Sequence, residues 1–181
     1  SDVQAVRIFG DGSVIAAGWF TTYNSTAAGR IVRLSASGAR DTSFNAGSGF
    51  DEYVVYDLGV QPDGRILVGG LFSSYNGTAS PCAARLNTDG TIDTTFSVAP
   101  GGGVRAIAAG ADGAVFIGGD FAWVSGVARS SAARLTGAGK VDASFAPTLR
   151  SRGTVNSAAL LPGGRVLIGG EFTHANGTAL T

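Results

Sequence analysis

The stretch Ile66-Leu67-Val68-Gly69-Gly70-Leu71-Phe72 decides the fold of this chain, because the same pattern is written several times. It returns as VFIGGDF at residues 115–121 and as VLIGGEF at residues 166–172, and a looser first copy is VIAAGWF at residues 14–20. The phenylalanines that end these copies lie about 50 residues apart, and a fixed period of this length indicates a repeat architecture.

The composition narrows the class of protein. The chain has 181 residues with 13 basic and 13 acidic side chains, so its charge favours neither nucleic acid nor an anionic membrane as a partner. Its 29 glycines are spaced between β-rich runs, which predicts many tight turns. Cys82 is the one cysteine, so no disulfide can form within the chain. No apolar stretch reaches about 18 residues, and we therefore expect no membrane insertion.

The copy that follows Tyr53 shows the plan of the first half of a repeat. A β-rich run at residues 54–60 ends at Pro62-Asp63-Gly64, and a second run follows at residues 65–72. An Asp-Gly pair between two such runs predicts a hairpin with a type I′ turn, in which both turn residues take a positive φ. The corresponding pairs in the other copies are Asp11-Gly12, Asp112-Gly113 and Gly163-Gly164.

The second half of the repeat predicts another hairpin. A third run at residues 83–86 is followed by a turn at residues 88–90 and a fourth run at residues 91–96, and its counterparts are residues 33–44 and 134–145. Each complete copy therefore predicts four short strands, and no segment has the 3.6-residue period of a helix. The chain is predicted to be all-β. Four-stranded antiparallel units at this period are typical of a β-propeller, in which each unit is one blade.

The alternation within the first strand predicts which residues line the central channel and which lie between blades. Small side chains suit the narrow channel, and aliphatic ones fill the space between blades. The predicted channel residues are Ala5, Gly59, Ala106, Ala108, Ser157 and Ala159. The predicted inter-blade residues are Val6, Ile8, Leu58, Val60, Ile107 and Leu160.

Two strings make the chain recognisable. Residues 61–70, QPDGRILVGG, followed by residues 84–96, ARLNTDGTIDTTF, resemble the delta-60 repeat of bacterial proteins, and both strings recur in order over essentially the whole chain. The resemblance implies a β-propeller with no assigned biochemical activity, found in long secreted or surface-exposed proteins that often carry adhesive or sorting modules elsewhere. The Gly-Gly pair also resembles Kelch repeats, but the half with Arg-Leu and Asp-x-Ser/Thr-Phe does not belong to them.

The hairpins amount to about three and a half repeats of roughly 50 residues in a single repeat domain, residues 1–181. Its repeats span approximately 1–44, 45–96, 97–145 and an incomplete 146–181. Propellers typically close with roughly four to eight blades. The chain is then a module of a longer protein, a ring completed by neighbouring chains, or an open arc. We expect a part of a longer protein, with a homo-oligomer as the alternative, since an unpaired strand edge attracts another chain.

Two motifs admit a metal or catalytic interpretation, but a structural one explains them better. Asn87-x-Asp89-Gly90-x-x-Asp93 resembles part of a calcium loop, yet the other copies lack its first ligands. We interpret it as a turn and expect neither a metal nor a cofactor. An aspartate also recurs eight residues after an arginine, and identical groups in every copy indicate ion pairing or turn capping rather than catalysis. These pairs are Arg33 and Asp41, Arg85 and Asp93, and Arg134 and Asp142.

Two further motifs also have simple structural explanations. The glycosylation-like triplets at residues 24–26, 76–78 and 176–178 fall at one repeat position, where Asn-Gly makes a turn. His174 is the one histidine, and the other copies have no histidine at its position. A zinc site or a catalytic relay needs further partners, so we expect a lone exposed histidine.

Positions that differ between copies are the candidates for binding, because a scaffold repeats while a binding surface varies. The inter-repeat loops at residues 45–53, 97–103 and 146–154 differ, and other variable positions surround the repeated phenylalanine. The predicted ligand-binding residues are Tyr56, Arg105 and Asn156 near the channel mouth, Phe50, Tyr53 and Arg150 on the loops, and Trp123 after the repeated phenylalanine. Exposed aromatic and polar groups of this kind bind sugars or proteins. The alternative is that unconstrained surface positions simply drift.

The sequence thus predicts a non-catalytic scaffold or adhesive binding module, extracellular or on a bacterial cell surface, that recognises a glycan or a surface protein through variable loops. One alternative is a structural spacer that self-associates through open strand edges. Another is a glycan-active enzyme of propeller type, which needs two carboxylates roughly 5–9.5 Å apart. Its candidates, Asp57, Asp120 and Glu171, fall at different repeat positions.

Overall fold

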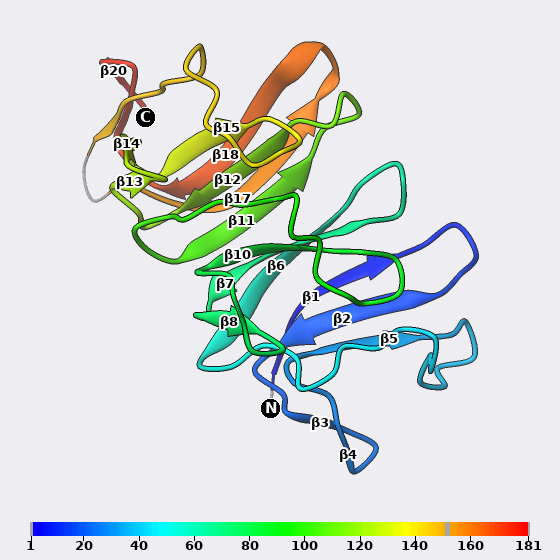
Figure 1. Ribbon diagram of the computed structural model, residues 1–181. Coiled ribbons are helices and arrows are strands. Elements are labelled where there is room, and N and C mark those ends of the chain that lie inside the picture. The colour runs from blue at the N-terminus through cyan, green and yellow to red at the C-terminus, as the bar shows by residue number, and fades with distance from the viewer. Residues whose placement is uncertain (1, 151–152, 181) are drawn as a thin grey trace.

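Each repeat forms one main antiparallel sheet in the computed structural model, which describes residues 2–150 and 153–180 (Figure 1). We call these sheets blades 1 to 4. Blades 1 to 3 have three strands each, with the second strand in the middle, and blade 4 pairs two strands. The strands of the first three blades are β1 (Val3–Ile8), β2 (Val14–Gly18) and β5 (Ile31–Leu34); β6 (Val54–Val60), β7 (Ile66–Leu71) and β10 (Ala83–Leu86); and β11 (Val104–Ala109), β12 (Val115–Gly119) and β15 (Ala132–Leu135). Blade 4 has β17 (Thr154–Leu161) and β18 (Arg165–Glu171), joined by the 3-10 turn η1 (Pro162–Gly164).

The all-β, propeller-type prediction is confirmed, but the fourth run of each complete repeat is shorter than a strand. It pairs with the third strand at one bridge only, such as Leu86 with Ile92. The aspartate that follows accepts hydrogen bonds from the backbone and the hydroxyl two residues later, as Asp93 does from Thr95 at 2.9 and 2.6 Å. This capped turn bends the chain away from the sheet and ends the pairing.

The Asp-Gly turns of the inner hairpins differ from the predicted type. Gly64 has a φ of 82°, whereas Asp63 is not among the described residues with a positive φ. The backbone N–H of Gly64 donates to the carbonyl of Gln61, and the N–H of Gln61 donates to the carbonyl of Arg65, both at 2.9 Å. These bonds define a type I turn with Gly64 in the following bulge, a geometry that suits Pro62 at the second turn position. The type I′ prediction was wrong for these turns.

Type I′ turns occur instead in four small hairpins that follow the second strand of each blade. Asn76 and Gly77 both have a positive φ, 46° and 77°, between β8 (Ser74–Tyr75) and β9 (Thr78–Ala79). The other small hairpins are β3 (Thr22–Tyr23) with β4 (Thr26–Ala27), β13 (Trp123–Val124) with β14 (Val127–Ala128), and β19 (His174–Ala175) with β20 (Thr178–Ala179). This geometry confirms the turn interpretation of the glycosylation-like triplets.

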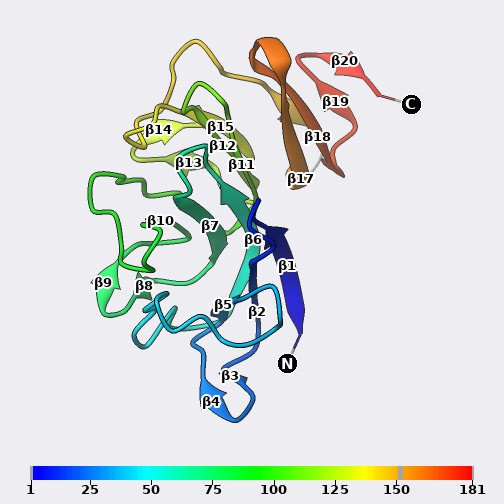
Figure 2. The same ribbon diagram turned by 90° about the vertical axis from the view of Figure 1, so that its right-hand side faces the viewer.

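The blades fan out from their first strands, which lie side by side at the inside of the arc, while the small hairpins lie at its outside (Figure 2). The core lies between consecutive blades. Val55 and Leu58 of blade 2 pack with Ile15 of blade 1, and Leu67 of blade 2 packs with Ile107 of blade 3. The stack therefore forms one continuous series of inter-blade cores.

The assignment of the two strand faces was right for the interior aliphatic residues Leu58 and Ile107 and wrong for the small residues Ala5 and Ala106. Leu58 and Ile107 are buried between blades, 0% and 1% exposed. Ala5 and Ala106 are buried too, in clusters that include the following blade, rather than lining a channel. Both faces of an interior blade meet a neighbouring blade, so small residues serve close packing there. Ile8 is 74% exposed because none of the described blades lies against that face of blade 1.

None of the described residues belongs to a helix that is long and apolar enough to span a membrane.

Candidate functional site

The two ends of the blades carry different kinds of residues. We call one the turn end: it holds the inner turns at residues 9–13, 61–65 and 110–114 and the outer turns at residues 35–39, 87–91 and 136–140. We call the other the bulge end, where the first strand of each blade begins and the second strand ends. Because each pair of strands is antiparallel, these two groups lie at opposite ends of the sheet.

A β-bulge opens the first strand of every blade. The register shifts between Val3 and Ala5 in blade 1, and at the equivalent point of each later blade. The residues in the bulges are Gln4, Tyr56, Arg105 and Asn156. This is the variable column from which three binding residues are predicted. A bulge redirects its side chain and often lies next to a functional site.

Arg105 joins two neighbouring blades in a polar and aromatic cluster at the bulge end. Its guanidinium carbon lies 5.1 Å from the ring centroid of Tyr56, and its Nη2 lies 3.2 Å from Oδ2 of Asp120. The side chains of Arg105 and Asp120 are 37% and 42% exposed. Within the described residues, Nε of Arg105 has no hydrogen-bond partner. The Tyr56–Arg105–Asp120 cluster thus presents a ring, a cation and a carboxylate, groups that bind hydroxyls and planar surfaces.

Sequence reasoning counted Asp120 among the variable positions around the repeated phenylalanine and among the candidate carboxylates of an enzyme, but it missed the place of Asp120 beside Arg105. The hairpin register explains the pairing, because Val104 pairs with Gly119 across β11 and β12. The residues that follow, Arg105 and Asp120, therefore meet at the bulge end. Aligning the two strands of the hairpin on either side of the turn at residues 110–114 would have placed Asp120 beside Arg105 from the sequence.

Phe50, a predicted binding residue, belongs to the core. It is 1% exposed, and its ring centroid lies 4.4 Å from that of Phe72 and 4.6 Å from that of Tyr75. The backbone of its loop is held against the small hairpin of blade 2 by a bridge between Phe50 and Tyr75. The prediction of a ligand contact was wrong because this loop is pinned to the blade rather than free.

The remaining predicted residues are placed separately. Tyr53 and Trp123 are 56% and 46% exposed, and Asn156 is exposed in the bulge of β17. The backbone of Arg150 pairs with His174 between β16 (Leu149–Arg150) and β19, and the side chain of Arg150 lies outside the described part of the structure. The structure brings Tyr56 and Arg105 together, and a binding role for the others stays a prediction.

The turn end repeats one arrangement in blades 1 to 3, which confirms the structural interpretation of its ion pairs. The arginine Nε lies 2.8 Å from the aspartate in the pairs Arg85–Asp93 and Arg134–Asp142, and 3.4 Å in Arg33–Asp41. Each guanidinium also lies over a phenylalanine ring, 4.5 to 5.2 Å from its centroid. For Arg85 and Arg134 the rings are those of the equivalent residues Phe96 and Phe145, whereas for Arg33 the ring is that of Phe9, which lies at the inner turn of blade 1.

Hydrogen bonds keep these turn-end carboxylates ionised. Burial opposes the charge of Asp93, but hydrogen bonds from Thr95 and the nearby arginines outweigh it and hold its pKa well below the usual value. Hydrogen bonds from Ser144 and Arg134 lower the pKa of Asp142 to about 2. In the calcium-like motif, Asp89 accepts bonds from the backbone and hydroxyl of Thr91 at 2.9 and 2.7 Å, as expected of a turn.

Asp57, a candidate carboxylate of the rival enzyme, connects three blades. Its Oδ1 accepts from Arg7 Nη2 at 2.7 Å and from the N–H of Leu58 at 2.8 Å, and its Oδ2 accepts from the N–H of Ile107 at 2.9 Å. Burial raises the pKa of Asp57, and these bonds partly offset the rise.

His174 is half-buried rather than exposed, with Nδ1 3.0 Å from the hydroxyl of Thr173.

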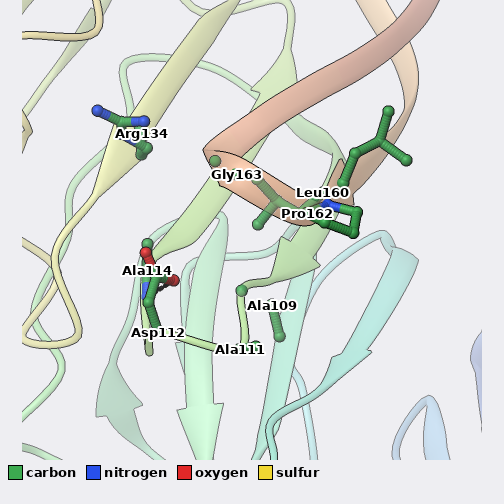
Figure 3. A pocket seen from close by; sticks show the side chains of 11 residues that line it. Ala109, Ala111, Asp112, Ala114, Arg134, Leu160, Pro162 and Gly163 are labelled. Carbon is green, nitrogen blue, oxygen red and sulfur yellow. Dashed lines mark hydrogen bonds between the residues drawn. The ribbon is translucent and has the colours of Figure 1, made fainter.

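A hollow of about 690 Å³ lies at the turn end between blades 3 and 4 (Figure 3). In the preceding blades the arginine reaches the outer turn of the next blade, as Arg33 Nη1 donates to the carbonyl of Thr88 at 3.3 Å. Arg134 is the equivalent arginine of blade 3, and it lines the hollow. The described part of blade 4 has no outer turn for Arg134 to reach. None of the predicted binding residues lines this hollow.

The repeated blades define a β-propeller class of protein. A family model described as a domain of unknown function (DUF5122) beta-propeller matches residues 10–44, 61–96 and 110–145, more than half of the chain. The chain belongs to this family, as the resemblance to a propeller repeat of unassigned activity predicted. The curated proteins contain no match to this sequence.

Proposed function

We propose that the chain is a non-catalytic binding module of an extracellular or bacterial cell-surface protein, and that it recognises a glycan or a protein through the Tyr56–Arg105–Asp120 cluster. The observation that supports the proposal is the contrast between the two ends of the blades. The bulge has the same backbone geometry in every blade but a different side chain in each, while the turn end repeats its ion pairs.

The physical basis is a rigid frame with adaptable side chains. The bulge strands β6 and β11 lie against each other in the arc, so their bulge residues need little reordering when a ligand binds (Figure 2). The ring of Tyr56 offers an apolar surface for stacking, and the guanidinium of Arg105 has donors for hydroxyl or carboxylate groups.

The extracellular location rests on the resemblance of the repeats to those of secreted bacterial proteins. Catalysis is not part of the proposal. Asp57 is held by three donors between the blades, and Asp120 is paired with Arg105. These carboxylates have structural and positioning roles in the proposed module.

The test is binding of the labelled chain to an array of immobilised oligosaccharides and purified cell-surface proteins. We expect Tyr56→Ala and Arg105→Ala each to weaken binding to the same array members about tenfold or more, which corresponds to about 1.4 kcal/mol. Arg165→Ala is the matched control, because Arg165 is exposed at the turn end and donates only to the carbonyl of Pro162, at 3.4 Å, among the bonds of the described residues. Binding that all three variants retain, or a wild-type chain that binds no array member, would contradict the proposal.

A further inference from the structure

Trp123 is an exposed tryptophan whose ring lies flat against the backbone of a neighbouring loop. A Cβ built on Gly101 would lie 2.6 Å from Cδ2 of the indole and closer still to Cε2 and Nε1. Cε2 is bonded to both of the other atoms, so a point this close to all three lies over the face of the ring rather than at its edge. One face of the indole therefore covers Gly101, while 46% of Trp123 stays exposed.

The glycine beneath this ring serves the ring rather than a turn. Gly101 is not among the described residues with a positive φ, so its backbone conformation suits residues with a side chain. The indole of Trp123 excludes a side chain here, because it fills the space that the Cβ would take. Gly101 and Trp123 are thus a matched pair, and their contact holds the ring in place before a ligand binds.

Blade 2 has a polar contact at the equivalent place. Two corresponding bridges align the loops of the two blades: Phe50 with Tyr75, and Pro100 with Val124. Asp51 therefore corresponds to Gly101, and Ser74 corresponds to Trp123. In blade 2 the carboxylate of Asp51 accepts a hydrogen bond from the hydroxyl of Ser74 at 2.8 Å, which holds the loop to the small hairpin. The frame of the repeat therefore does not require an exposed aromatic ring at this position.

A run of three glycines, from Gly101 to Gly103, connects the ring to the Tyr56–Arg105–Asp120 cluster. A Cβ built on Gly103 would lie 3.0 Å from Oδ1 of Asp120. The Cα atoms of Gly101 and Gly103 are two residues apart, so they lie no more than about 7.6 Å from each other. This segment has no side chains, so the indole and the exposed ion pair adjoin the two ends of a stretch of bare backbone.

An aromatic face beside a paired cation and carboxylate fits the chemistry of a sugar ring. The C–H face of a pyranose is apolar and stacks on an aromatic ring, while its hydroxyls both donate and accept hydrogen bonds. Arg105 has donors for these hydroxyls, and Asp120, which is 42% exposed, accepts from them. The ion pair therefore offers neighbouring hydroxyls a donor and an acceptor side by side.

Other ligands that stack on tryptophan fit this surface less well. A proline-rich peptide docks on aromatic side chains, but its prolines have no N–H to donate to Asp120. The bases of a nucleic acid also stack on aromatic rings, but its phosphates need a surplus of positive charge. The charges of Arg105 and Asp120 cancel, so this surface offers no such surplus.

We propose that Trp123 is the stacking platform of a carbohydrate site, on which a sugar ring of an oligosaccharide lies while its hydroxyls bind Arg105 and Asp120. This inference rests on the proposed function, and it selects a glycan rather than a protein as the ligand of the module. Trp123 contacts the sugar directly. Gly101 is a positioning residue, because it acts through the ring that it supports.

The first experiment uses the fluorescence of the two tryptophans in the chain, Trp19 and Trp123, which are both 46% exposed. The Trp19→Phe variant keeps Trp123 as its one tryptophan, and the Trp123→Phe variant keeps Trp19. Each is titrated in solution with the neutral and uronic-acid oligosaccharides that the wild-type chain binds on the array. We expect saturable quenching or a shift of the emission from Trp123 and no change in the emission from Trp19.

The second experiment measures affinity for the same oligosaccharides. Trp123→Ala should weaken binding about tenfold or more, whereas Trp19→Ala, the matched control of equal exposure, should bind as the wild type does. Gly101→Ala keeps the indole but displaces it from the loop, and the same loss of affinity is expected. Thermal melting of each variant checks that it is folded.

The outcomes separate this inference from the proposed function. Oligosaccharide binding that Arg105→Ala weakens and Trp123→Ala leaves unchanged would overturn the platform and leave the proposed function standing. An equal loss in Trp19→Ala would overturn the platform as well. Binding to surface proteins alone would overturn the choice of a glycan but not the binding module. A wild-type chain that binds no array member would overturn both.

Discussion

The turn end of blade 2 and the bulge end between blades 2 and 3 use the same chemistry in different surroundings. At the turn end Arg85 binds Asp93 and lies 4.9 Å from the ring centroid of Phe96, with only 3% of Arg85 and 7% of Asp93 exposed. At the bulge end Arg105 binds Asp120 and lies 5.1 Å from the ring centroid of Tyr56, but both charged groups are more than a third exposed. A buried arginine cluster of this kind holds blades together, whereas an exposed one leaves its groups available to a ligand.

The largest effect is expected when the buried cluster is broken. Arg85→Ala removes one of the two arginine partners of Asp93, since Arg65 Nη1 stays 2.8 Å from Oδ2 of Asp93, and it removes the bond of Arg85 Nη1 to the carbonyl of Gly137 in blade 3. Breaking a buried ion pair on one side is strongly destabilising, but Arg65 still compensates part of the charge of Asp93. We therefore expect a loss of about 3 kcal/mol in the free energy of unfolding, at the low end for a buried pair. Chemical denaturation followed by circular dichroism measures this loss.

The equivalent pair in blade 3 provides the control. The side chains of Arg134 and Asp142 are 25% and 28% exposed, so Arg134→Ala should cost about 1 kcal/mol or less. Equal losses of unfolding free energy in Arg85→Ala and Arg134→Ala would show that the burial of the ion pair does not determine its contribution to stability.

The next largest effect is expected from acid, which should destabilise the fold through the carboxylates of the turn end. The pKa of Asp142 is about 2 in the folded chain, below its ordinary value of 3.8, and that of Asp93 is lowered as well. The folded state therefore binds fewer protons than the unfolded state, so these carboxylates stabilise the fold above about pH 4. This contribution is lost as the pH falls from about 4 towards 2. Asp57 acts in the opposite direction, because its pKa is raised.

The measurement is the melting temperature from pH 6 to pH 2. It should fall steeply below about pH 4, and Asp142→Asn should show a shallower fall because the variant cannot gain that proton. An unchanged slope in Asp142→Asn would contradict the assignment of acid sensitivity to this carboxylate.

The smallest effect is expected at the bulge end. Arg105→Ala removes an exposed ion pair and a contact with an aromatic face, each worth roughly 0.5 to 1 kcal/mol or less. We expect it to lower the free energy of unfolding by about 0.5 kcal/mol, within the range of ordinary surface changes. Denaturation under the conditions used for Arg85→Ala makes the comparison direct, and a loss near 3 kcal/mol would place Arg105 among the residues that hold the blades together.

The candidate site was only partly predictable from the sequence. Variation between copies identified Tyr56 and Arg105, because local comparison of repeats needs no tertiary information. Phe50 was misplaced, since nothing local shows that its loop is bridged to Tyr75. Asp120 was missed as a neighbour of Arg105 because their contact depends on the hairpin register. The Asp-Gly turns formed the expected hairpins, but their turn type depends on a bulge that the dipeptide alone does not specify.

The sequence by itself determined the repeat, the all-β class, the positions of the turns and the Arg–Asp pairs, because periodicity and turn chemistry act over a few residues. Tertiary structure decided which copies of the same side chain are buried. Leu67 and Leu167 stand at one position of the repeat, yet the first is fully buried and the second is 63% exposed. Their exposure differs because burial depends on whether a neighbouring blade lies against that face of the sheet. The repeated sequence is the same at both positions, so it does not show which of the two leucines is covered.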